Sequence, residues 1–319
     1  MTDPRAYVLI GPCRNEAKFM RRTLESVVNQ TVKPSKFIIV DDGSDDETPA
    51  IAREYAVEHD FIELIQREDR GFRKVGGGVI EAFDFGLSKI RLQDYAFVCK
   101  IDLDLDLPYG YFEGLIDKMA NNPRLGTCSG KPYYLDTEGR KVSEACGDEF
   151  SVGMTKFFRR ECFEDIGGFV QQVMWDAIDC HTARLLGWQV EAFNDDALAF
   201  EHLRPMGSSQ KGILTGRARH GFGQWYMGTG PIYLLAGAVN RMRRPPYLSG
   251  GLAVLWGYSK AAVDGTPRHG TKKFRAFVQD FHRRILTKGK RRAMQEVEAE
   301  LEATWQERQP QTSHCENAE

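Results

Sequence analysis

Phe37-Ile-Ile-Val-Asp-Asp-Gly-Ser44 carries the clearest architectural signal in this chain of 319 residues. Four consecutive apolar residues are typical of a strand buried on both faces, and the polar cluster after them is typical of a turn. Residues 6–10 form a similar run that ends at Gly11-Pro12, and residues 95–101 form another. Helical spacing of apolar residues separates these runs. The pattern predicts an α/β fold with a mostly parallel, doubly wound sheet and helices on both faces.

The remaining elements follow from the same periodicities, although the alternation blurs after about residue 125. Residues 207–231 contain seven glycines, which predicts a loop region. The residues beyond them predict a helical extension. Further strands are expected at 61–65 and 189–193, and helices at 16–30, 79–90, 111–120 and 175–187.

Charge and cysteine content narrow the class of protein. Lys and Arg total 43 against 45 Asp and Glu, so the net charge of −2 gives no argument for nucleic acid. Residues 268–292 hold ten basic residues and one acid, whereas residues 295–319 hold seven glutamates and one arginine. Seven cysteines without a CxxC pair, and no signal peptide, predict a cytoplasmic protein.

Three aspartates alternate with leucines in Lys100-Ile-Asp-Leu-Asp-Leu-Asp-Leu-Pro108. In an extended chain Asp102, Asp104 and Asp106 would share one face, and their mutual repulsion would favour binding of a divalent cation. Oxygen ligands suit Mg²⁺ or Mn²⁺. A solvated acidic strand end is the competing interpretation.

Three motifs in order resemble the start of the family 2 glycosyltransferases. They are Gly11-Pro-Cys-Arg-Asn-Glu16, Leu24-Glu-Ser-Val-Val-Asn-Gln-Thr31 and Ile39-Val-Asp-Asp-Gly-Ser-Asp-Asp-Glu-Thr48. The resemblance covers roughly residues 5–205. It implies the GT-A fold and transfer of a sugar from a nucleotide donor with inversion at the anomeric carbon.

The resemblance also implies roles for residues near the carboxyl ends of the expected strands. Asp42, with Asp41 as second choice, would bind the nucleoside, and Lys74 would reach the donor phosphates. Arg70 and Arg73 compete with Lys74 for that role. A turn followed by a helix cap is the structural alternative for residues 41–46. Pro12 and Glu16 match positions that wall the base and ribose.

For the metal, the resemblance favours Asp102 and Asp104, which would hold Mg²⁺ or Mn²⁺ against the diphosphate. Asp102 would thereby also contact the nucleotide. Asp106 is expected either to be a ligand or to begin the helix after Pro108. His202 occupies a position where relatives often carry a histidine near the metal, although a structural histidine is equally expected there.

Asp176 matches the catalytic base of the family, counted back from Gly187-Trp188. It would take the proton of an acceptor hydroxyl. Asp179 is the reserve candidate for this role, and Trp175 is expected to pack in the core rather than to stack on a sugar. Residues 217–225 only loosely resemble an element of processive synthases, so transfer of a single sugar is expected.

These inferences predict a GT-A catalytic domain over residues 1–205, with a nucleotide-binding half at 1–108 and an acceptor half at 109–205. Residues 206–294 would form a flexible loop and a basic helical extension, and residues 295–319 a disordered acidic tail. Basic and aromatic residues at 241–292 suit either an anionic membrane surface or packing on the catalytic domain.

The expected partners are a UDP-, GDP- or dTDP-linked sugar and a carbohydrate or lipid-linked oligosaccharide acceptor, with no nucleic acid. The expected location is cytoplasmic, with peripheral contact at the inner face of the membrane. Two other functions fit the same fold. One is a nucleotidyltransferase that makes nucleotide sugars, and the other is a non-catalytic subunit that binds them.

Overall fold

A computed structural model describes residues 3–71, 76–144, 146–204 and 212–308. The strands are β1 (Tyr7–Cys13), β2 (Lys36–Asp41), β3 (Ile62–Gln66), β4 (Phe97–Ile101), β5 (Leu105–Asp106), β6 (Leu125–Ser129), β7 (Pro132–Leu135), β8 (Lys141–Ser143), β9 (Thr155–Arg159), β10 (Gln189–Ala192) and β11 (Phe200–His202). The helices are α1 (Ala17–Val28), α2 (Thr48–Glu58), α3 (Gly77–Leu87), α4 (Tyr111–Ala120), α5 (Arg160–Asp165), α6 (Trp175–Leu185), α7 (Ile213–Met227), α8 (Pro231–Met242), α9 (Leu248–Val263), α10 (Lys272–Lys288), α11 (Lys290–Glu300) and α12 (Glu302–Arg308), with a 3-10 turn at Leu92–Asp94.

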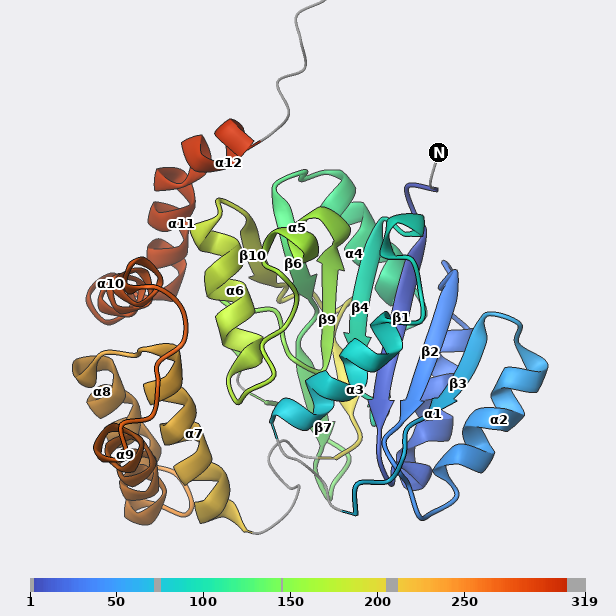
Figure 1. Cartoon of the computed structure of the whole chain (residues 1–319), viewed down its shortest axis with the longest axis horizontal. Helices are drawn as coiled ribbons and strands as arrows, with labels where there is room; N and C mark the ends of the chain where they lie inside the picture. The colour runs from blue at the N-terminus through green and yellow to red at the C-terminus, as the bar shows by residue number, and fades with distance from the viewer. Residues whose placement is uncertain (1–2, 72–75, 145, 205–211, 309–319) are drawn as a thin grey trace, which may run out of the picture.

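Seven strands form the central sheet in the order β10-β6-β9-β4-β1-β2-β3 (Figure 1). All neighbouring pairs are parallel except the two made by β9, which runs antiparallel to β4 and β6. The mostly parallel sheet is therefore confirmed. The reversed strand was not predicted, because β9 begins with the buried polar residues Thr155 and Lys156 and so lacks a clean apolar run.

Strands β1, β2 and β4 of the central sheet contribute to two apolar cores, one on either face. Tyr7 and Leu9 of β1 pack with residues of α1, α2 and α4. Val8 and Ile10 of the same strand pack with residues of α3, α5 and α6. Because helices cover both faces of β1 and β2, the central residues of these strands are apolar, as the sequence pattern indicated.

A small second sheet, ordered β5-β11-β7-β8, extends the fold beyond the carboxyl end of β4. Its strand β5 pairs antiparallel with β11, so that His202 lies opposite Leu105 and Glu201 opposite Asp106. This pairing brings a residue that is about one hundred positions away in sequence next to the aspartate motif.

Helix α7 corrects the prediction of a loop over residues 207–231, since residues 213–227 are helical. The glycines allow close helix packing instead of marking a loop. A Cβ atom on Gly221 would lie 1.9 Å from the carbonyl oxygen of Val254, and one on Gly257 would lie 1.8 Å from that of Ala218. Only glycine permits α7 and α9 to approach so closely.

Helix α10 packs against the catalytic domain rather than presenting its apolar face to solvent. Phe274 and Val278 share a core with Ile178 of α6, and Phe281 packs with Val297 of α11. For this part of residues 241–292, packing is therefore the correct one of the two predicted alternatives.

The prediction of a disordered acidic tail is wrong for residues 295–308, which continue α11 and form α12. The acidic residues are ordered because they pair with the basic segment before them. Arg284 lies 2.6 Å from Glu300, and Lys288 lies 2.6 Å from Glu296. Residues 309–319 lie outside the described part of the chain.

Candidate functional site

The carboxyl ends of β1, β2 and β4 lie at one edge of the sheet, because these strands are parallel neighbours. Pro12 and Cys13 pair with Val40 and Asp41 at the ends of their strands. Asp102 directly follows β4. Pro12, Asp41 and Asp102 therefore lie at the same edge of the sheet.

Asp41 and Asp42 are adjacent in sequence but have different hydrogen-bond partners. Both oxygens of Asp41 are engaged in the turn: Oδ1 accepts from the Ser44 amide at 3.0 Å and Oδ2 from the Gln66 side chain at 3.0 Å. Asp42 instead accepts from Arg67 and Arg70, each at 2.7 Å. The structural alternative therefore holds for Asp41, whereas Asp42 lies between two cationic side chains.

Arg70 links Asp42, which follows β2, to helix α3, since its guanidinium bonds both Asp42 and Glu81 at 2.7 Å. It is thus not a solvated surface charge. Hydrogen bonds to these carboxylates raise the pKa of Arg70, which keeps it cationic. Lys74 and Arg73 lie outside the described residues.

Pro12 and Glu16 form a buried wall at the end of β1. Pro12 is the sixth residue of that strand and is buried. The Glu16 amide donates to Thr48 Oγ1 at 2.8 Å, which ties the start of α1 to the start of α2. The Glu16 carboxylate accepts from Arg204 at 2.9 Å and so connects to the aspartate motif.

Asp102 is partly exposed, with 32% of its side chain accessible. It pairs with the buried ammonium of Lys100, which also donates to the Gly153 carbonyl at 2.9 Å. Desolvation in the crevice raises the pKa of Asp102, and the nearby Asp104 adds to this rise while Lys100 opposes it. A cation at this place would relieve the same repulsion.

Asp104 is buried and lies between two cationic groups. Its Oδ2 accepts from Arg204 Nε at 2.9 Å and lies 3.5 Å from His202 Nε2. Burial alone would raise the pKa of Asp104, but His202 and Arg204 outweigh it and lower this pKa. Oδ1 of the same carboxylate is buried and has no hydrogen-bond partner among the described residues.

Asp106 differs from both of its neighbours in the motif. It lies in β5 and bonds Arg22 Nε at 2.9 Å. It does not begin a helix, because α4 starts at Tyr111 and is preceded by Gly110. That expectation for Asp106 is therefore wrong.

His202 is held by two carboxylates. Its Nδ1 lies 3.0 Å from both oxygens of Glu144, and its Nε2 faces Asp104. Burial lowers the pKa of His202, but the hydrogen bonds to Asp104 and Glu144 dominate and raise it to about 9. The imidazole is therefore protonated at neutral pH in this arrangement.

Asp176 lies in the first turn of α6, and its carboxylate makes no hydrogen bond or ion pair with a described residue. A Cβ on Gly153 would lie 3.1 Å from Asp176 Oδ2, so the carboxylate packs on this glycine. Lys100 binds the carbonyl of the same glycine. The aspartate motif and Asp176 thus approach Gly153 from two sides.

Asp179, the reserve candidate, is a structural residue. Both of its oxygens accept from the buried Lys156 at 2.5 Å. Neither side chain is accessible to a substrate. Trp175 is also buried and packs edge-on against Phe169 at 5.0 Å between ring centroids, which confirms its predicted place in the core.

Comparison with known proteins decides the family. The model of "Glycosyl transferase family 2" matches residues 8–172, which is more than half of the chain. The match includes Asp42 and the aspartate motif, whereas Asp176 and His202 lie beyond it. This chain is a family 2 glycosyltransferase by descent. Glycosyltransferase AglE of Haloferax volcanii is 39% identical over 59% of this chain and 70% of its own length.

The other similarities are more distant. EpsH of Bacillus subtilis is 26% identical over 178 residues, which cover 56% of this chain and 47% of EpsH. The chain therefore spans less than half the length of this relative. The mannosyltransferase PcManGT from Pyrobaculum calidifontis, solved with GDP-Man and Mn²⁺, superposes with a TM-score of 0.51 at 21% identity. That match covers 95% of this chain and 88% of PcManGT, and it shows the GT-A fold.

The side chains at this site supply only some of the oxygen ligands that a divalent cation such as Mg²⁺ or Mn²⁺ needs. Asp104 offers a buried oxygen without a partner, and the exposed Asp102 lies two residues away. Among the described residues, no three His, Cys, Asp or Glu side chains are grouped closely enough to hold a metal unaided. An ion at this place would therefore need further oxygen ligands from the substrate.

Several site residues escaped prediction from the sequence. Lys100, Glu144 and Arg204 each contact the aspartate motif or His202, yet none stands in a recognisable motif. Lys100 gave the only available signal, since a lysine inside an apolar strand is rarely buried without a partner. Arg204 and Glu144 reach the site only through the second sheet.

Other expectations concern the surroundings of the site. Residues 217–225 belong to α7, where Trp225 donates to the Thr266 carbonyl at 2.8 Å. None of the helices in the described ranges is both long and apolar enough to cross a membrane. Six cysteines within the described residues are free thiols.

Proposed function

We propose that this chain is an inverting glycosyltransferase that transfers one sugar from a nucleotide-sugar donor to an acceptor hydroxyl with Mg²⁺ or Mn²⁺. The observation that carries this proposal is the position of four carboxylates at one edge of the sheet. Asp42, Asp102 and Asp104 line the donor side, and the unengaged Asp176 approaches them across Gly153. Family membership favours this reaction over nucleotide-sugar synthesis.

Asp42 would bind the nucleoside of the donor, with Pro12 and Glu16 walling the base and ribose. A carboxylate accepts hydrogen bonds from a uracil-type N–H or from ribose hydroxyls. Asp41 would only hold the turn, because both of its oxygens are engaged. Arg70 would reach the phosphates beside Lys74, since its guanidinium lies next to the nucleoside position.

Asp104 and Asp102, with His202 beside them, would hold the divalent cation. When bound, the ion offsets the negative charge of the leaving nucleoside diphosphate. Arg204 now supplies positive charge to Asp104 and Glu16. Its guanidinium would be free to contact the diphosphate once a cation neutralises these carboxylates.

Asp176 would act as the general base. Its carboxylate would accept the acceptor hydroxyl proton while the hydroxyl oxygen bonds the anomeric carbon. The bond between that carbon and the phosphate oxygen would break on the opposite face, which inverts the configuration and releases the nucleoside diphosphate. Lys100 would hold the two halves of the site together through Asp102 and Gly153.

The acceptor would be a carbohydrate or a lipid-linked oligosaccharide in surface polysaccharide or glycan assembly, reached from the inner face of the membrane. Support comes from the relatives. The poly-beta-1,6-N-acetyl-D-glucosamine synthase of Staphylococcus epidermidis is 31% identical over 38% of this chain, although only 27% of its own length is covered.

Replacement of the base tests the reaction. Asp176→Asn should abolish sugar transfer, with a loss of at least about a hundredfold, while the affinity for UDP, GDP or dTDP measured by calorimetry with Mn²⁺ stays unchanged. Asp196→Asn, on the exposed surface, is the matched control. Unchanged turnover in a screen of nucleotide sugars would refute the role of Asp176, and absence of any nucleotide binding would refute the function.

A further inference from the structure

Helices α7, α8 and α9 carry most of the large apolar side chains that are exposed on the described part of the chain. Ten of the fourteen such residues lie between Ile213 and Val263. On α8 they recur at spacings of three and four residues, and on α9 at four, so each helix presents one apolar stripe. The α8–α9 stripe consists of Ile232, Leu235, Val239, Leu248, Leu252 and Trp256.

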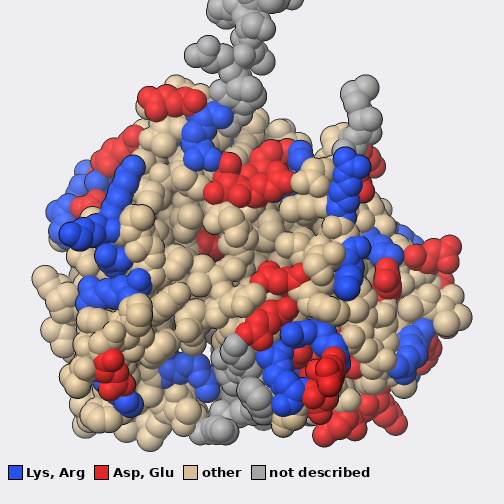
Figure 2. All heavy atoms as spheres, viewed as in Figure 1, with Lys and Arg blue, Asp and Glu red and all other residues tan. Residues whose placement is uncertain are grey.

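The two halves of the stripe lie on helices in direct contact. A Cβ on Gly251 of α9 would fall 2.5 Å from the carbonyl oxygen of Ala238 of α8. Ile232 is 74% exposed and Trp256 is 65% exposed, so neither stripe is covered by the described chain. In Figure 2 the lower left of the molecule, over these helices, is mainly tan with few charges.

The charges that flank the stripe are of one sign. Residues 203–263 contain eight Lys or Arg and no Asp or Glu. Arg217, Arg241 and Arg244 come from α7, α8 and the turn after α8, and we call them the arginine cluster. Burial lowers the pKa of Arg241, and the like charges of Arg217 and Arg244 lower it further.

None of these three arginines forms an ion pair with a residue in the described ranges. This differs from the neighbouring helices, where Arg284 of α10 pairs with both Asp280 and Glu300. Because like charges repel, the arginine cluster requires anions from outside the chain.

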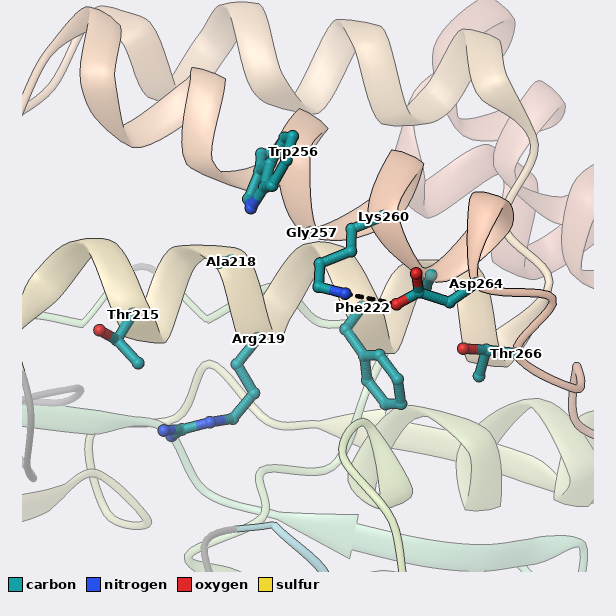
Figure 3. Close-up of a pocket in the computed structure, with 10 residues that line it drawn as sticks. Thr215, Ala218, Arg219, Phe222, Trp256, Gly257, Lys260, Asp264 and Thr266 are labelled. Carbon is teal, nitrogen blue, oxygen red and sulfur yellow. Dashed lines mark hydrogen bonds and ion pairs between the residues drawn. The ribbon is translucent and has the colours of Figure 1, made fainter.

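A cavity of about 300 Å³ opens beside the stripe, between α7 and α9. Figure 3 shows Trp256 of α9 and Arg219 of α7 on opposite sides of it. Lys260 is also at this cavity but is paired with Asp264 at 2.5 Å. An aromatic side chain at the rim and an arginine below it are suited to the boundary between acyl chains and headgroups.

We propose that α7, α8 and α9 dock on the surface of an anionic phospholipid bilayer. The α8–α9 stripe would enter the acyl boundary, and the arginine cluster would contact headgroup phosphates. A second copy of the chain is disfavoured because a symmetric contact would bring two arginine clusters together. Nucleic acid would leave the apolar stripe exposed.

Docking on this surface would place the protein beside a lipid-linked acceptor. This use of the surface rests on the proposed function. In Figure 1 the start of α7 and the carboxyl ends of β1 and β2 lie toward the same lower edge of the molecule. A bilayer at that edge would bring the headgroup of a lipid-linked acceptor toward the site.

Vesicle flotation of the full chain tests the docking without any donor or acceptor. The protein should float with phosphatidylglycerol–phosphatidylcholine vesicles and not with pure phosphatidylcholine, and binding should weaken as salt is raised. Arg217→Gln and Arg244→Gln should each weaken binding about fivefold. Leu252→Ser with Trp256→Ser should weaken it roughly tenfold or more.

Val57→Ser and Lys33→Gln are the matched controls, since both residues are exposed outside the helical extension. All these variants should keep the nucleotide affinity of the parent, and Asp176→Asn should float normally. Equal binding to both kinds of vesicle, full competition by inorganic phosphate alone, or loss of a dimer in the stripe variant would each overturn the proposal. Loss of transfer with intact flotation would instead count against the proposed function.

Discussion

Asp102, Asp104 and Asp106 belong to one short motif but meet different partners. Asp102 pairs with Lys100, Asp104 with Arg204 and His202, and Asp106 with Arg22. Only Asp104 keeps a buried oxygen without a partner among the described residues. This oxygen atom distinguishes Asp104 from the other two aspartates of the motif as the residue with the greatest need for a cation.

Asp104→Asn should therefore abolish the Mn²⁺-dependent part of nucleotide affinity, because the neutral amide cannot replace a carboxylate toward a divalent cation. We expect a loss of roughly a hundredfold in calorimetric affinity, about 2.7 kcal/mol. Asp106→Asn is the matched control and should change affinity less than about twofold. Metal-dependent binding that survives Asp104→Asn would show that the ion is held elsewhere.

Glu144 sets the charge state of the neighbouring histidine. The folded-state pKa of His202 is raised from 6.5 to about 9, so its contribution to stability is full below pH 6.5 and is lost as the pH rises through 9. Glu144→Gln should lower the pKa of His202 by about one unit, measured by NMR titration of the imidazole. An unchanged titration would mean that Asp104 alone holds the proton.

At the scale of the element, helix α6 carries two aspartates three residues apart that differ in burial and in partners. Asp176 stands in the first turn with an unengaged carboxylate, whereas Asp179 is buried against Lys156 of β9. Spacing along a helix places both on neighbouring positions of one face. Which of them meets solvent depends on the strand packed against that face.

The Lys156–Asp179 pair should stabilise the junction of α6 with the sheet only as an intact pair. Lys156→Met should reduce the free energy of unfolding by about 3–5 kcal/mol, because it leaves a buried carboxylate without a partner. The double variant Lys156→Met with Asp179→Leu should recover most of this loss in thermal denaturation. Lys260→Met breaks an exposed pair and should cost less than about 1 kcal/mol.

Buried histidines at the packing of α10 on α6 and α8 should make the free energy of unfolding depend on pH. Burial lowers the pKa of His282 to about 3, and its ring stacks on Tyr233 at 3.8 Å between centroids. Burial also lowers the pKa of His181 well below its ordinary value. Both groups bind protons in the unfolded chain below pH 6.5 but not in the folded one, so the stability present above pH 6.5 falls as the pH drops toward 3.

The expected slope is about 1.4 kcal/mol per pH unit for each histidine. Thermal denaturation at pH 7 and pH 5 measures it. His282→Phe keeps the stacking on Tyr233 and should reduce the slope by the contribution of one histidine, about 1.4 kcal/mol per pH unit. A variant that loses stability with acid as steeply as the parent would contradict this assignment.

At the scale of the whole molecule, the C-terminal helices belong to the folded unit. Arg124 near β6 bonds a backbone carbonyl of α11, and Arg308 of α12 pairs with Asp165 of α5 at 2.6 Å. Met294 and Val297 are buried by the same packing. One side of the catalytic domain is therefore covered by residues whose composition predicted a disordered tail.

Truncation after Gly289 should consequently destabilise the whole protein by about 2–4 kcal/mol, because it removes these buried side chains. Truncation after Arg308 is the control and should leave the melting temperature unchanged. If both truncated chains melted with the parent, the helices α11 and α12 would not contribute to the stability of the domain.

Local patterns in the chain were sufficient for the alternating strands and helices of the first 120 residues, and for the edge where Asp42, Asp102 and Asp104 meet. Periodicity and turn chemistry act over a few residues, so they can be read directly. The same local logic failed for β9, where a buried lysine hides the strand, and for α7, where glycines that signal a loop serve helix packing.

The partners of the site depended instead on tertiary structure. Arg204 reaches Glu16 across 188 positions of sequence, and Glu144 reaches His202 across 58. No short-range pattern encodes such contacts, because they follow from how the second sheet folds onto the end of β4. The sequence thus determined at which strand and helix ends the carboxylates lie. Only the packing of distant segments decided which of them are neutralised, which are buried and which one has no partner among the described residues.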